Sequence, residues 1–148
     1  MEPGFIFADS LSEVVSIASG FSFDVIQSDG DIRFDCMVGA MNIIGNKKNG
    51  MIFISAKESD MRILTSYMTG ASVDEIKKED MCDALCELVN MTAGNVKIRI
   101  SDPDYMFMLS LPFAITGENV SVITKSHAKA FTQVLGNGEI SLKLKVIY

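Results

Sequence analysis

The sequence predicts an α+β fold, a duplicated arrangement in which two long helices pack on an antiparallel sheet. Stretches with apolar residues at every third or fourth position alternate with short runs rich in Val, Ile and Phe, which indicates helices alternating with strands. The two halves of the chain also resemble each other at an offset of about 74 residues. With 148 residues, 48% of them apolar, the chain is long enough to bury one core. We therefore expect a single domain over residues 1–148.

The first half of the chain is expected to form a helix, three strands and a second helix. Asp9 or Ser10 is a plausible N-cap, because short polar side chains accept hydrogen bonds from the free amides that begin a helix. The turn Ser28-Asp29-Gly30 predicts a hairpin between the first two strands. In chain order the expected elements are a helix at 10–20, strands at 21–27, 31–41 and 51–56, and a helix at 59–67 that stops at Gly70.

The second half is expected to form one long helix followed by strands. Pro112 closes the first of these strands, because proline has no backbone N–H to donate to a sheet. The last segment alternates apolar residues with Ser and Lys, which is typical of a half-exposed strand. The expected elements are a helix at 79–96 and strands at 105–111, 120–125, 131–135 and 140–148.

The duplication is clearest in the first and the long helix. Four polar or glycine positions coincide when the chain is shifted by 74 residues: Asp9 with Asp83, Glu13 with Glu87, Ser16 with Asn90, and Gly20 with Gly94. The apolar positions of the two helices coincide as well. We therefore expect two repeats, over about 5–72 and 79–148. Amphipathic helices that end in glycine are common, and this is the simpler alternative.

The long helix carries a polar stripe opposite its apolar face. At about 100° per residue, the members of the stripe lie within about 60° of one another. They are Asp83, Glu87, Asn90 and Gly94. The residues predicted to be buried on the opposite side are Met81, Ala84, Leu85, Leu88, Val89, Thr92 and Val96. Such a helix presents an acid, an amide and a position without a side chain to its surroundings.

Composition excludes several classes of function. The formal net charge of −6 opposes sequence-independent binding of nucleic acid, which requires clustered Lys and Arg. No apolar run approaches the roughly 20 residues that span a bilayer, and the N-terminus has no signal-peptide pattern. The three cysteines fit a reducing compartment. We expect a cytoplasmic protein that binds neither membrane nor nucleic acid.

Metal binding and nucleophilic catalysis are not expected of this chain. Cys82 and Cys86 lie one helical turn apart, but structural zinc takes four ligands and His127, the single histidine, has no spacing relation to them. His127 lies in the polar segment Lys-Ser-His-Ala-Lys, which is typical of a surface. No glycine-rich phosphate loop is present, and Gly-Asn-Lys-Lys-Asn-Gly at 45–50 is better explained as a hairpin connection.

Two kinds of chemistry are open to the polar stripe. Paired carboxylates act as acid and base in glycosidases, but such groups need an enclosed pocket, which an outward helix face lacks. An exposed Glu–Asn pair is better suited to entering a partner's site, where the amide could orient a water for attack on phosphorus and the carboxylate could pair with a lysine. Gly94 would let the partner's backbone approach closely. The plain alternative is an ordinary solvated helix face.

The spacing of these residues resembles the signature of a known family. Asp83-x3-Glu87-x2-Asn90, followed by Pro112 after 21 intervening residues, is similar to the motif of the CheC/CheX/FliY phosphatases of bacterial chemotaxis. The phrase around Pro112, Leu-Ser-Leu-Pro, with Ile-Thr-Gly shortly after it, most resembles CheX. The family has a duplicated fold, with the motif in both halves of CheC-type members and in one half of CheX-type members. Ser16, which stands where an amide would be needed, fits the single-site pattern.

The resemblance implies a phosphatase that hydrolyses the aspartyl phosphate of a CheY-like response regulator. It implies that Asn90 orients the attacking water and that Glu87 pairs with a lysine of the regulator. Asp83, Gly94 and Pro112 would contribute to the partner-binding face. The phosphorylated aspartate and its Mg²⁺ would belong to the regulator, so the chain would need no cofactor of its own.

Two further functions are compatible with the same resemblance. One is a non-catalytic CheX-like adaptor that binds a receiver domain or another signalling protein, and the other is a structural component related to the flagellar switch. CheX-like proteins are also dimers that pair through strands. We therefore expect a homodimer, with the strand at 140–148 as an available edge.

Overall fold

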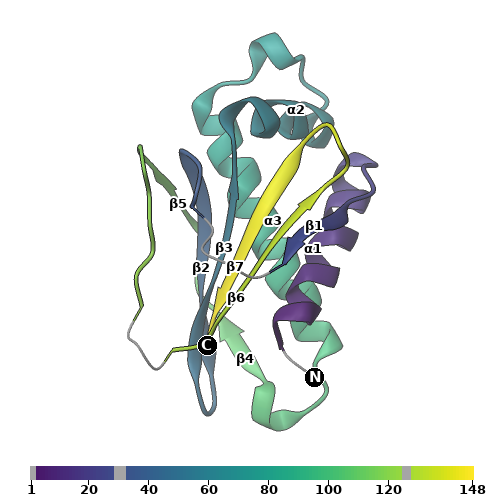
Figure 1. Ribbon diagram of the computed structural model, residues 1–148. Helices are drawn as coiled ribbons and strands as arrows, with labels where there is room; N and C mark the ends of the chain where they lie inside the picture. Colours follow the sequence, from purple (N-terminus) through teal and green to yellow (C-terminus); the bar gives the residue numbers. More distant parts are fainter. Residues whose placement is uncertain (1–2, 29–32, 125–127) are drawn as a thin grey trace.

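The computed structural model describes residues 3–28, 33–124 and 128–148 as one antiparallel sheet with helices on one face (Figure 1). The helices are α1 (Pro3–Ser19), α2 (Glu58–Thr69) and α3 (Lys78–Arg99), with short 3-10 turns η1 (Val73–Glu75) and η2 (Pro103–Tyr105). The strands are β1 (Asp24–Ser28), β2 (Met37–Gly45), β3 (Asn49–Ala56), β4 (Phe107–Leu109), β5 (Phe113–Thr116), β6 (Ala130–Gly136) and β7 (Ser141–Ile147). The predicted α+β class is confirmed.

The strand order is symmetric about the centre of the sheet. The order is β1-β6-β7-β3-β2-β4, and β5 pairs with β2 beside β4. Exchanging β1 with β4–β5, β2 with β6 and β3 with β7 reproduces the same order. The first strand of each half therefore pairs with a strand of the other half. Strand β1 of the first half pairs with β6, and β4 and β5 of the second half pair with β2. This symmetry supports the internal duplication.

The main core lies between the sheet and the helices. All seven residues predicted for the apolar face of the long helix are buried in α3. They pack with fully buried side chains of α1 and the sheet, among them Leu11, Val15, Met41 and Ile54. A smaller cluster around Val38 covers the other face of the sheet, with Val120 and Val122 from the chain that follows β5. Burial of these apolar side chains supplies the main driving force for the fold.

Helix α3 approaches the sheet most closely at Gly39 of β2. A Cβ atom built on Gly39 would lie 2.9 Å from Val89 Cγ2 and 3.0 Å from the carbonyl oxygen of Leu85. Real Cβ atoms rarely come so close to other heavy atoms, so only glycine lets the helix rest on the strand at this point. The contact holds the turn of α3 that precedes Asn90.

Several predicted elements are confirmed. The helix expected at 59–67 is α2, which ends at Gly70 in the left-handed conformation with a φ of 76°. The strands expected at 51–56 and 131–135 are β3 and β6, and the β2–β3 hairpin turns at residues 46–48, inside the connection expected at 45–50.

The predicted start of the first helix is wrong. Helix α1 begins at Pro3, so Asp9 and Ser10 lie inside it and cap nothing. Proline is well tolerated in the first turn of a helix, where its missing N–H would have no partner. Buried Phe7 and Ala8 extend the apolar face of α1 by about one turn beyond the predicted boundary.

The hairpin predicted between the first two strands is wrong. Strand β1 pairs with β6 and not with β2, so the strands at 21–27 and 31–41 are not neighbours. Both strands also lie further along the chain than expected, at 24–28 and 37–45. The turn residues Asp29 and Gly30 lie outside the described residues. A turn sequence reports local geometry only, and here the partner of β1 comes from the other repeat.

The strand predicted at 105–111 is shorter in the structure, where β4 covers only 107–109, and the sequence does not predict β5, which follows Pro112. Leu109 of β4 pairs with Ile43, and Phe113 of β5 pairs with Ala40. Three residues, 110–112, therefore face only two of β2, which makes a bulge. Pro112 lies in this bulge, where its missing N–H costs no sheet hydrogen bond.

The strand predicted at 120–125 is not found over 120–124, and Lys125 lies outside the described residues. Instead, Val120 and Val122 of this segment pack on the second face of the sheet. Lys145 Nζ on β7 donates a hydrogen bond to the carbonyl oxygen of Val122 at 3.3 Å, which ties this segment to the sheet.

The predicted C-terminal strand is confirmed as β7, but it is not an edge. Its buried positions alternate with half-exposed ones, as expected. It lies between β6 and β3 in the middle of the sheet, so both of its sides are already paired. The edges are β1 on one side and β4 with β5 on the other.

Gly39→Ala is expected to lower the free energy of unfolding by about 1–3 kcal/mol, because the new methyl group would push α3 away from β2. Gly94→Ala is the matched control, since a Cβ at that helical position meets nothing within 4 Å. The control should stabilise the protein by about 0.5–1 kcal/mol. Urea unfolding followed by circular dichroism measures both, and a Gly39→Ala protein as stable as the wild type would contradict the contact.

Candidate functional site

The polar stripe of α3 lies on the solvent side of a helix that is held in place. Asp83, Glu87 and Asn90 are exposed, whereas the opposite face of α3 is buried against the sheet, α1 and α2. None of the three side chains forms a hydrogen bond or ion pair with any described residue. Their side chains are therefore available to a partner while the helix beneath them is fixed.

Gly94 shares the stripe but does not end the helix. Helix α3 continues to Arg99, so the expected end near residue 96 is slightly early. The space where a Gly94 side chain would stand is open. A glycine inside a helix costs stability relative to alanine, yet no contact in the described fold requires one here. The stripe thus has an uncovered patch of backbone one turn beyond Asn90.

Pro112 lies at the edge of the sheet next to α3. It precedes β5, which packs against α3, and Ala114 of β5 pairs with Gly39 under the helix. Ser110 keeps the bulge paired with β2: its N–H donates to the Asn42 carbonyl at 3.2 Å, and its Oγ accepts from Asn42 N–H at 3.0 Å.

The bulge also presents Leu111, a residue that the sequence reasoning did not select. Its side chain is 86% exposed, although it is a large apolar residue beside the half-buried Pro112. The alternation of a regular strand gives no signal for this, because the extra residue of the bulge changes which side chains turn outward.

The two cysteines of α3 flank the stripe and are poor nucleophiles. Burial raises the pKa of Cys82, and the nearby carboxylates of Asp83 and Glu79 raise it further while Lys78 opposes them. Burial also raises the pKa of Cys86, and the nearby Cys82 and Asp83 raise this pKa further. Both thiols are therefore protonated near neutral pH. Across the described residues, no group of three or more His, Cys, Asp or Glu side chains is placed to hold a metal ion, and His127 lies outside those residues.

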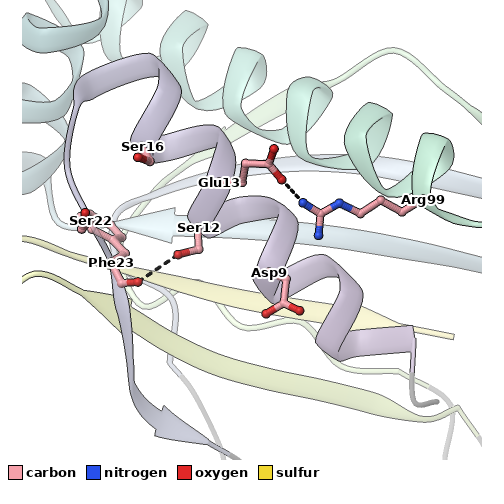
Figure 2. A pocket seen from close by; sticks show the side chains of 7 residues that line it. All are labelled: Asp9, Ser12, Glu13, Ser16, Ser22, Phe23 and Arg99. Atoms are coloured by element: carbon pink, nitrogen blue, oxygen red, sulfur yellow. Dashed lines mark hydrogen bonds and ion pairs between the residues drawn. The ribbon is translucent and has the colours of Figure 1, made fainter.

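Helix α1 carries the counterpart of the stripe, and its carboxylate is engaged. Asp9, Glu13 and Ser16 are exposed on α1, as their equivalents are on α3. Figure 2 shows Glu13 paired with Arg99, which reaches across from the last turn of α3. These residues line a shallow polar cavity of about 460 Å³, together with Ser12, whose Oγ donates to the Phe23 carbonyl at 2.9 Å.

The two stripes therefore differ in both groups that matter for chemistry. Glu87 has no partner among the described residues, whereas Glu13 is neutralised by Arg99. Asn90 offers a donor and an acceptor on one amide, whereas Ser16 has only a short hydroxyl. The arrangement of α3 can place an acid and an amide into a partner's site, and that of α1 cannot do so in the same way.

The comparison with protein families identifies the chain. The family model described as chemotaxis phosphatase CheX matches residues 37–135, which is two thirds of the chain. The chain therefore belongs to the CheX family of chemotaxis phosphatases, and the expected resemblance is confirmed. No curated protein matches the chain.

Solved structures share the fold over nearly the whole chain. CheX from Vibrio vulnificus is 17% identical with a TM-score of 0.84, over 99% of this chain and 98% of that one. CheX in the CheX–CheY–BeF3–Mg²⁺ complex from Borrelia burgdorferi is 18% identical with a TM-score of 0.79, over 97% and 96%. FliY from Thermotoga maritima is 15% identical with a TM-score of 0.66, over 99% and 85%. At these identities the likeness establishes the fold.

No helix in the described part of the chain is both long and apolar enough to cross a membrane. The cytoplasmic location stays a prediction.

Cys82 and Cys86 are expected to react with a chromogenic aromatic disulfide more slowly than free glutathione near neutral pH, because the raised pKa leaves less thiolate. The rate should climb steadily as the pH passes the ordinary thiol value of 9.0. A Cys36→Ser variant leaves only the two thiols of α3 to be measured. Reaction as fast as that of glutathione at neutral pH would contradict the assignment.

Proposed function

We propose that this protein accelerates hydrolysis of the aspartyl phosphate on a CheY-like response regulator. Its family is that of the chemotaxis phosphatases, and a structural relative is known in complex with CheY, BeF3 and Mg²⁺. The observation that carries the proposal is the Glu87–Asn90 pair. Both side chains are exposed and without partners among the described residues, on a helix whose other side is buried.

The spacing of the pair suits insertion into a receiver's phosphorylation site. Residues three apart on a helix are surface neighbours, with Cβ atoms about 5–6 Å apart. The Asn90 amide would hold a water in line with the phosphorus, and the Glu87 carboxylate would pair with a lysine of the receiver. Attack by the water breaks the bond between phosphorus and the aspartate oxygen, releasing inorganic phosphate and the free carboxylate.

Positioning is the main contribution that a protein can make to this reaction. Phosphoryl transfer has a loose transition state and needs little covalent help, so an oriented water and a fixed approach supply most of the gain. Buried Leu85, Leu88 and Val89 hold α3 against the sheet, which keeps the pair in a constant geometry. The receiver would supply its own phosphorylated aspartate and Mg²⁺, so we propose no cofactor for this chain.

The remaining stripe residues would form the docking surface around the pair. Asp83, one turn before Glu87, is free to contact the receiver, and Gly94 leaves room for its backbone. Pro112 shapes the bulge at the sheet edge, and we add Leu111 to this surface as an exposed apolar contact. Burying an exposed apolar side chain at an interface removes its surface from water, which favours binding.

Homodimerisation stays a prediction. Among the described strands, those with an unpaired side are β1 and β4–β5, so either of these would replace β7 as the pairing edge.

Asn90→Ala is expected to remove most of the acceleration, by roughly tenfold or more, because the water loses the group that orients it. Ser16→Ala is the matched control on α1 and should leave the rate nearly unchanged. The measurement is loss of phosphate from a receiver phosphorylated with acetyl phosphate, in the presence of Mg²⁺.

The outcomes separate the possible functions. Unchanged decay with the wild-type protein across several receivers would refute the phosphatase proposal. Binding to the receiver without faster decay, insensitive to Asn90→Ala, would identify a non-catalytic adaptor instead. A large loss in Ser16→Ala would show that the α1 stripe also acts.

Leu111→Ser is expected to raise KM for the phosphorylated receiver severalfold while leaving kcat unchanged, because the residue would contribute to docking and not to the chemical step. Met108→Ser is the control. Met108 is 68% exposed on the adjoining strand, and it pairs with Ile44 on the sheet face away from the helices. A KM equal to that of the wild type in Leu111→Ser would exclude Leu111 from the docking surface.

A further inference from the structure

A larger cavity lies beyond the C-terminal end of α3, away from the Glu87–Asn90 pair in the middle of that helix. It has a volume of about 690 Å³ and is lined by the β2–β3 connection, the chain around η2, and residues of β7. Ile100, directly after α3, lines it, so about 15 Å of helix separates this cavity from Asn90. No residue of the polar stripe lines it, and the proposed phosphatase reaction does not use it.

The floor of this cavity is apolar and buried. Phe7, Ile43 and Phe107 meet there from α1, β2 and β4, with exposures of 4%, 9% and 7%. Val146 and Ile147 close the side formed by β7. A volume of this size falls within the range of about 300–1,000 Å³ found for small-molecule sites, which are likewise mostly apolar with a few polar groups.

The rim of the cavity is basic, in a protein whose net charge is −6. Three lysines line it. Lys47 pairs with Asp104 at 2.6 Å, and this pair neutralises the one acidic side chain of the lining. Lys48 and Lys129 form no side-chain hydrogen bond or ion pair with any described residue. The lining side chains therefore include three lysines against one carboxylate beside an apolar floor, and Tyr148, which also lines the cavity, pairs with Lys129 through the backbone at 2.8 and 3.0 Å.

Two glycines shape the hairpin that carries Lys48. A Cβ at Gly45 would overlap the carbonyl oxygen of Lys48, and a Cβ at Gly50 would overlap that of Ile147. At both positions the backbone lies so close to a carbonyl oxygen that only glycine fits. These contacts fix the backbone of the hairpin that carries Lys48.

We propose that this cavity binds a small amphipathic anion, with an aromatic or alkyl body on the apolar floor and one carboxylate, sulfonate or phosphate between Lys48 and Lys129. A sugar or a nucleoside would need several hydrogen-bonding side chains that the floor does not provide. A cation would be repelled by the positive charges of the two lysines. The site is independent of the phosphatase proposal, because it shares no residue with the polar stripe.

Anilinonaphthalene sulfonate is a suitable probe, since it combines an aromatic body with one anionic group. Saturable one-to-one binding is expected in fluorescence titrations, and amide chemical shifts should move at residues around Lys48, Tyr105 and Phe107. Lys48→Glu/Lys129→Glu should weaken binding at least about tenfold. Lys57→Glu/Lys78→Glu, which makes the same charge change at exposed lysines outside the cavity, should change it less than about twofold.

Two further measurements keep the test independent of folding and of total charge. Phenylnaphthylamine, the uncharged analogue, should lose much less affinity than the sulfonate in the Lys48→Glu/Lys129→Glu protein. Met106→Trp, a change at a half-exposed lining residue, should reduce binding of both probes by filling the cavity. No saturable binding below about 1 mM, equal losses in the two double variants, or shifts confined to residues outside the lining would each overturn the proposal.

Discussion

The contact of α3 with β2 at Gly39 is the constraint on which the candidate site depends. It brings the backbone of Leu85 and the side chain of Val89 directly onto the strand. Because the helix cannot rotate without driving these atoms into the sheet, the side opposite them is fixed toward solvent. Asp83, Glu87 and Asn90 lie on that side. The absence of a side chain at Gly39 therefore determines that the carboxylates and the amide of this stripe face solvent.

This helix face occurs twice in the fold, on α1 and on α3, and the two occurrences carry different side chains. The symmetric strand order, with first strands exchanged between halves, makes the α1 and α3 sides of the molecule equivalent in architecture. Their polar stripes are not equivalent in chemistry. Arg99, from α3 itself, engages Glu13 on α1, while Glu87 stays unpaired among the described residues. The polar stripe of α3 is therefore accessible to a partner, whereas Glu13 in the stripe of α1 is already engaged in an internal ion pair.

Much of this could be predicted from the sequence, because periodicity reports which side of an element is buried. The apolar face of α3, the stop of α2 at Gly70 and the grouping of Asp83, Glu87 and Asn90 follow from local spacing alone. Pairing partners do not follow from it. The exchange of β1 to β6, the central place of β7 and the bulge that exposes Leu111 depend on contacts between distant parts of the chain. The Glu13–Arg99 ion pair also joins distant parts of the chain, so local spacing does not predict it.

Glu87 and Asn90 have separate tasks in the proposed reaction, and steady-state kinetics with a phosphorylated receiver tests this division most directly. Glu87→Ala should raise KM with a smaller change in kcat, because the carboxylate holds the partner. Asn90→Ala should lower kcat with little change in KM, because the amide acts on the water. If both variants shifted KM alone, or if neither changed the rate, α3 would be a binding surface only and the proposed catalytic role of Asn90 would be wrong.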